Sequence, residues 1–193
     1  MTLLIVGLVL FLGVHSIAFI APAFRDAARN RLGAGGWKAV YSLASLAGFV
    51  LICYGFGLAR QAPVVLYVPP QWLRHVASLL MLPVFPLLFA VYLPGRIKAA
   101  TKHPMLTAIK CWALAHLLAN GNLGDVLLFG GFLAWAVVDR ISLKRRPPPP
   151  PPPPLGASAR TSNDVVAVVL GLASYALFVL WAHRLLFGVS PIG

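Results

Sequence analysis

Six long apolar stretches dominate this chain and restrict where it can fold. Each approaches the roughly 20 mostly apolar residues that a transmembrane helix needs. Of the 193 residues, 60% are hydrophobic and only 10% are charged, whereas about a quarter of the residues in soluble domains are charged. A chain in lipid must satisfy its own backbone hydrogen bonds, so helices are expected. The sequence therefore predicts an all-α, polytopic membrane bundle of about six transmembrane helices, at residues 3–24, 39–59, 75–93, 104–119, 125–138 and 165–187.

The basic residues are unevenly divided between alternate loops. In a soluble protein the net charge of +12 would suggest binding to nucleic acid, but here Lys and Arg flank apolar stretches, where they set the orientation in the membrane. Thirteen of the sixteen lie in alternate loops or beside them: Arg25, Arg29, Arg31, Lys38, Arg96, Lys98, Lys102, Lys110, Arg140, Lys144, Arg145, Arg146 and Arg160. This bias predicts cytoplasmic basic loops, both termini outside, and a lipid bilayer rather than nucleic acid as the partner.

A run of eight prolines, residues 147–154, separates the last apolar stretch from the others. Such a run favours a stiff polyproline II rod, of about 25 Å at 3.1 Å per residue. We therefore expect three parts: a five-helix membrane core at 1–146, a cytoplasmic linker at 147–163 and an additional transmembrane helix at 164–193, peripheral to the core. The first stretch lacks the basic start of a signal peptide, so we expect it to be retained.

Two of the five histidines, His15 and His116, lie deep in the predicted spans. At 1.5 Å per residue they are about 15 and about 20 Å from the cytoplasmic ends of their helices. An imidazole in hydrocarbon has lost its water and must find another partner, so such residues often mark a site. The other three lie near predicted helix ends, where they reach water or headgroups: His75, His103 and His183.

Two deep imidazoles at similar depth have few physical uses. They can hydrogen-bond between helices, form a proton path or bind a metal. The acidic residues that a proton path would use are all near loops or helix ends: Asp26, Asp125, Asp139 and Asp164. A closed zinc site needs four ligands, whereas haem needs only one or two axial histidines and sits readily between apolar helices. Haem fits best, and hydrogen bonding in a plain helical scaffold stays open.

Three fragments carry a resemblance to a known family: GVHSIAFIAPAFRD in the first stretch, KHPM at the start of the fourth and CWALAHLLANGN at its end. They resemble the NnrU family and the related plant and cyanobacterial ζ-carotene isomerase. The matching pieces of the isomerase read His-Ser followed by Arg-Asp, then His-Pro, then Ala-His ending in Gly-Asn. The order of the fragments and the 13 residues from His103 to His116 strengthen the resemblance, which covers residues 1 to about 146.

The resemblance implies a membrane-embedded haem b with His15 and His116 as its axial ligands, the same pair that depth singles out. His103 matches the third histidine of the motif, and because Pro104 follows it we interpret it mainly as a helix start. Trp112 and Asn120 lie one turn from His116 on either side, so we expect them, with His103, to support the site. The isomerase has a cysteine where this chain has Ala113, which argues against a thiolate ligand switch.

The function that the resemblance implies is that of a bacterial inner-membrane haem protein linked to nitrogen-oxide (denitrification) or redox metabolism, with nitric oxide as a ligand. One alternative is a haem-dependent cis–trans isomerase acting on a lipid-soluble polyene, and another is a non-catalytic membrane scaffold. A membrane methyltransferase would need an acidic, tyrosine-bearing segment near the C-terminus, and residues 143–162 contain neither acid nor tyrosine. Whether the protein is an enzyme, and its oligomeric state, are left open.

Overall fold

The computed structural model describes residues 1–146 and 160–191, and within these ranges every regular element is a helix. The one β-type pairing in the described residues is an isolated bridge between Val65 and Asn122. The all-α prediction is therefore confirmed. The helices are α1 (Thr2–Ile20), α2 (Pro22–Gln61), α3 (Trp72–Met81), α4 (Val84–Tyr92), α5 (Arg96–Thr101), α6 (Pro104–Ala119), α7 (Leu123–Arg145), α8 (Thr161–Leu177), a π-helical turn η1 (Phe178–Ala182) and α9 (His183–Phe187).

Five helical stretches of the described residues are long and apolar enough to cross a membrane, and a sixth, α6, is shorter. The five are Thr2–Ile20, Pro22–Gln61, Trp72–Tyr92, Leu123–Arg145 and Thr161–Phe187. All six predicted spans therefore correspond to apolar helices. The third is divided into α3 and α4 at Leu82 and Pro83.

The chain divides into two compact units, Met1–Tyr67 with Gly121–Ser142, and Val68–Asn120 with Leu143–Gly193. We call them unit 1 and unit 2 and describe each by itself. The predicted division into core, linker and additional helix stays a prediction, and most of its linker, residues 147–159, lies outside the described residues. The described end of that linker is already helical, because α8 begins at Thr161.

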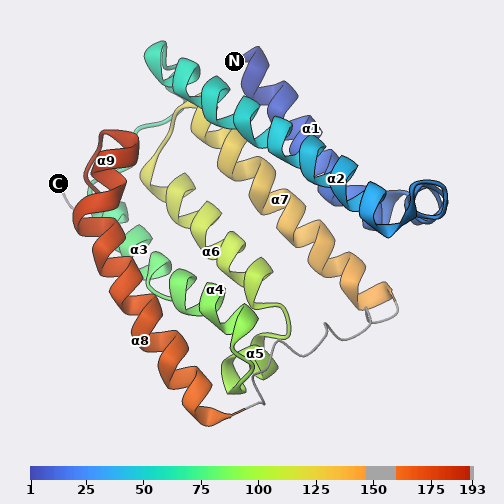
Figure 1. Ribbon diagram of the computed structural model, residues 1–193. Helices are drawn as coiled ribbons and strands as arrows, with labels where there is room; N and C mark the ends of the chain where they lie inside the picture. Colours follow the sequence, from blue (N-terminus) through green and yellow to red (C-terminus); the bar gives the residue numbers. More distant parts are fainter. Residues whose placement is uncertain (147–159, 192–193) are drawn as a thin grey trace. The chain divides into compact units, whose positions relative to one another are not determined.

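Unit 1 contains α1, α2 and α7, which run alongside one another (Figure 1). Glycines let the backbones of α1 and α2 approach closely. A Cβ at Gly48 would lie 2.8 Å from the backbone nitrogen of Phe11, and a Cβ at Gly55 would lie 2.7 Å from the carbonyl carbon of Leu3. In lipid, where helices gain little from hydrophobic burial, such small residues allow the close packing that holds helices together.

The first basic segment of unit 1 is a helix and not the loop that the sequence suggested. Residues 22–32 belong to α2, which changes direction at Gly33, where φ is 70° and ψ is 167°. Only glycine adopts such a backbone conformation easily. The arginines of this segment therefore sit on a helical arm, and Arg25 there pairs with Asp26 at 2.8 Å.

In unit 2, α4 packs against both α6 and α8 (Figure 1). Gly171 of α8 lies directly on Pro86 of α4. The carboxylate of Asp164 accepts hydrogen bonds from the backbone nitrogens of Arg96 and Ile97, at 2.8 and 3.0 Å, and so caps α5. Within unit 2 the last helix thus packs on α4 and caps α5, and its predicted position peripheral to the core stays a prediction. A Gly-to-Pro contact and a helix cap between distant segments carry no signal in the local sequence.

The packing of α1 on α2 gives a test with a matched control. We expect Gly55→Ala to destabilise the protein by about 1–3 kcal/mol, because the added methyl group overpacks the contact with Leu3 and Leu4. Gly57→Ala, two residues away on the same helix, meets no atom within 4 Å, and we expect it to be neutral or to stabilise by up to about 1 kcal/mol. Thermal unfolding in detergent, followed by circular dichroism, measures both. Equal stability of the two variants would contradict this packing.

Candidate functional site

His15 lies on α1, and its ring is fixed by the preceding helical turn. Its Nδ1 donates a hydrogen bond to the carbonyl oxygen of Phe11 at 2.7 Å. The imidazole also stacks on the Phe11 ring, with the two centroids 4.2 Å apart and the planes 28° from parallel. The i−4 spacing brings both the carbonyl and the aromatic ring to the same face of the helix. The half-buried imidazole therefore has one defined orientation.

The other two helices of unit 1 each place an aromatic ring beside His15. Tyr41 of α2 lies 5.4 Å from the imidazole, centroid to centroid, and Trp135 of α7 meets it edge-on at 6.1 Å. The close approach of Gly48 to Phe11 brings this part of α2 against α1. The spacing of four residues alone places Phe11 beside His15, whereas nothing in the sequence pointed to Tyr41 or Trp135. Only tertiary packing brings these two to His15.

His116 lies in the last turn of α6, in unit 2, and is held in the same way. Its Nδ1 donates to the carbonyl oxygen of Trp112 at 2.8 Å, and the two rings lie 5.5 Å apart. On the other side, the amide nitrogen of the Asn120 side chain donates to the carbonyl oxygen of His116 at 2.9 Å. Trp112 in turn packs on the buried residues Val84, Leu87 and Ala108. The two predicted neighbours, Trp112 and Asn120, are therefore both hydrogen-bonded to His116 along α6.

The shared hydrogen bond determines which ring nitrogen of each histidine can bind a metal. A backbone carbonyl can only accept a hydrogen bond, so Nδ1 must carry the proton in both His15 and His116. In the neutral ring, Nε2 then has the lone pair. Histidines that bind metals typically use one nitrogen as the ligand while the other donates to a carbonyl or carboxylate in this way. Both deep histidines have the protonation pattern of an Nε2 ligand.

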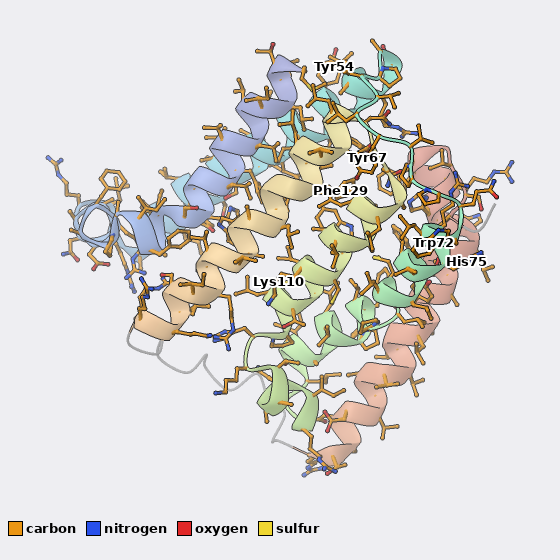
Figure 2. All side chains as sticks on the ribbon, turned by 180° about the vertical axis from the view of Figure 1, so that it is seen from behind. Tyr54, Tyr67, Trp72, His75, Lys110 and Phe129 are labelled. Atoms are coloured by element: carbon orange, nitrogen blue, oxygen red, sulfur yellow. The ribbon has the colours of Figure 1, made fainter. Side chains whose placement is uncertain are left out.

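The remaining histidines have the positions expected of structural or interfacial residues. His103 is the N-cap of α6 and precedes Pro104, so its interpretation as a helix start is confirmed. His75 is exposed beside Trp72 near the start of α3 (Figure 2). The Nδ1 of His183 donates to the carbonyl oxygen of Val189 at 2.8 Å, near the end of the described chain.

The described residues contain no group of three or more His, Cys, Asp or Glu side chains that could surround a metal ion. Both cysteines, Cys53 and Cys111, are free thiols. Two-histidine ligation needs no such group, because the porphyrin supplies the other four ligands of a haem iron.

A second polar feature of unit 1 lies at the start of α7. The buried carboxylate of Asp125 accepts from the backbone nitrogen and the side-chain nitrogen of Asn122, at 3.3 and 3.0 Å. The bond from the Asn122 backbone nitrogen is one half of a capping box. Together with Phe56 and Arg60 these residues line a cavity of about 150 Å³. Burial, and then the negative charge of Asp125, raise the pKa of Tyr67, which lies in the loop between α2 and α3. The capping accounts for Asp125, so we assign it a structural role.

Apolar spanning helices that carry ordered, half-buried histidines define a polytopic helical membrane protein. The family model described as NnrU protein matches residues 3–191, so the chain belongs to the NnrU family. The match extends beyond the resemblance seen in the sequence, because it includes the proline-rich segment and the last helix. Neither a curated protein nor a solved structure matches the chain.

Proposed function

We propose that this protein is a haem b protein of the membrane, with His15 and His116 as the axial ligands of the iron. One observation carries the proposal: both deep imidazoles donate from Nδ1 to the carbonyl four residues earlier, at 2.7 and 2.8 Å. The same hydrogen bond in both histidines leaves Nε2 as the ligand nitrogen and increases its basicity.

The neighbouring residues also fit a porphyrin. Phe11, Tyr41 and Trp135 present aromatic surfaces beside His15, and Trp112 does so beside His116. Such residues exclude water from the iron ligands and restrict rotation of the rings. A haem held by two histidines supplies a one-electron redox couple, and it binds a diatomic ligand such as nitric oxide only where one histidine leaves. These uses agree with a role in redox or nitrogen-oxide metabolism.

The second candidate function is cis–trans isomerisation of a lipid-soluble polyene. In the related isomerase a cysteine stands three residues before the second histidine, and here that position is Ala113, which is fully buried at 0% exposure. Chemistry that depends on a thiolate at this place is therefore not available to this chain. Ala113 favours the redox and nitrogen-oxide role. Conversion of a poly-cis carotene by the reduced protein would instead favour the isomerase. A colourless purified protein would exclude both haem-dependent functions and leave the non-catalytic scaffold.

We further propose the inner membrane of a bacterium as the location, with the basic segments in the cytoplasm. The uneven distribution of Lys and Arg supports this orientation. The helices of unit 1 are compatible with it: Phe11 and His15 of α1 meet Phe132 and Trp135 of α7 in the same order along the chain, so these helices run parallel. Successive spans alternate in direction, so two spans whose order numbers differ by an even number run parallel, and all other pairs run antiparallel. The first and fifth predicted spans meet the parallel condition.

Haem ligation predicts a specific pattern of absorption spectra. We expect the detergent-purified protein to show a b-type Soret band that shifts on reduction, and His15→Ala and His116→Ala to lose or greatly weaken it, since each removes an axial ligand. His75→Ala and His183→Ala are the matched controls and keep the band. Colourless wild-type protein after haem-replete expression would refute the proposal. Full haem retention in both His15→Ala and His116→Ala would show that these two histidines are not the ligands.

The orientation predicts which sites react with a membrane-impermeant maleimide in cells. In a background in which Cys53 and Cys111 are alanine, Ser190→Cys is expected to be labelled from outside. Asn30→Cys, on the exposed basic arm of α2, is expected to be labelled only after the membrane is permeabilised. Labelling of Asn30→Cys in intact cells would contradict the proposed cytoplasmic location of the basic arm.

A further inference from the structure

The basic arm of unit 1, residues 22–32 of α2, is attached at both ends to membrane-spanning helices. Only Ala21, whose backbone is not helical at φ −137° and ψ 60°, separates the arm from the end of α1. At Gly33 the chain changes direction again, and the rest of α2 forms the second apolar span. Figure 1 shows the arm almost end-on, whereas α1 and the rest of α2 are seen from the side. The arm therefore runs across the direction of the spans, along the surface of the membrane that they cross.

The arm carries an apolar stripe with an arginine at each edge. Phe24, Ala28 and Leu32 follow one another at intervals of four residues, so they lie within about 80° of one another around the helix. Arg25 and Arg31 lie about 20° beyond the two edges of this stripe. The side chains of Phe24 and Leu32 are on residues that are 61% and 51% exposed. The protein therefore leaves much of the apolar stripe uncovered.

An uncovered stripe of this kind fits the boundary between lipid headgroups and hydrocarbon. Interfacial helices bury phenylalanine and leucine at that depth and keep basic residues beside the headgroups. Arginine side chains at the edge of an apolar face extend from it toward the phosphates. Three arginines and one aspartate, Asp26, give the arm a net charge of +2. Trp37, just beyond the arm, is of a residue type that is enriched at membrane interfaces.

We propose that the basic arm is an interfacial helix that binds anionic phospholipid headgroups. The stripe formed by Phe24, Ala28 and Leu32 inserts among the acyl chains, and the arginines contact the lipid phosphates. In the proposed orientation these lipids belong to the cytoplasmic leaflet. The inference does not depend on haem, so the absorption spectra that test the iron ligands and the measurements below can fail independently.

Two spin labels on the full-length protein measure which face of the arm meets lipid. The background has alanine at Cys53 and Cys111, and the vesicles contain equal amounts of phosphatidylcholine and phosphatidylglycerol. Ala28→Cys places a label within the stripe, and Asn30→Cys is the matched control, about 160° from the centre of the stripe. We expect the label at Ala28→Cys to be more accessible to oxygen, which dissolves in hydrocarbon. The label at Asn30→Cys should be more accessible to a water-soluble nickel chelate.

Two other results with these labels would overturn the inference. Equal access of the nickel chelate to both labels would show that the arm stands in water, where a soluble partner could bind it. Shielding of the label at Ala28→Cys from both oxygen and the nickel chelate would show that the stripe packs on protein, such as a second copy of this chain.

The role of charge is tested by replacing two exposed arginines of the arm. We expect Arg29→Gln combined with Arg31→Gln to shift the equilibrium from the bound toward the detached arm, by about fivefold per arginine. Greater access of the nickel chelate to the label at Ala28→Cys measures this shift. Arg29→Lys combined with Arg31→Lys is the charge-matched control and should keep the label buried. Vesicles of phosphatidylcholine alone should reproduce the effect of the glutamine variants. Unchanged access in the glutamine variants and in these vesicles would overturn the binding of anionic headgroups.

Discussion

The absence of water from the apolar interior is the constraint that determines the arrangement of the polar side chains. A polar group there must bond to the chain itself, and the nearest acceptor in a helix is the carbonyl of the preceding turn. Ser16, His15 and His116 all use it, at 2.6 to 2.8 Å. For serine this only satisfies a hydroxyl. For histidine it also selects the tautomer, because the proton at Nδ1 leaves the lone pair on Nε2.

Close helix packing surrounds each of these histidines with side chains from other parts of the chain. In unit 1, Gly48 and Gly55 bring the backbones of α2 and α1 into contact, and this contact sets which residue of α2 lies beside His15. The aromatic side chains of α2 and α7 then surround an imidazole whose orientation is already fixed. In unit 2, buried Ala113 and the packed Trp112 anchor α6 in a comparable way. Packing and hydrogen bonding therefore act together on each histidine.

The sequence alone was enough for features that depend on local spacing or composition. Apolar length predicted the helical membrane class, and the i±4 spacing predicted Trp112 and Asn120 as neighbours of His116. Contacts made between helices were not predictable, because residues such as Tyr41 and Trp135 are identified only once the glycine contacts fix the helix register. The basic arm at 22–32 was mistaken for a loop because charge indicates exposure and does not exclude a helix. The packing of the last helix on α4 was not predictable either, because a proline run carries no information about how the next helix packs.

We propose that two neutral imidazoles, those of His15 and His116, bind one haem iron through Nε2. Low-temperature electron paramagnetic resonance of the oxidised, haem-loaded protein tests it most directly, because the signal reports the number and type of axial ligands. Ligation by His15 and His116 predicts the low-spin ferric signal of two axial imidazoles. A fully loaded wild-type protein with a high-spin signal, or with the low-spin pattern of a thiolate ligand, would contradict it.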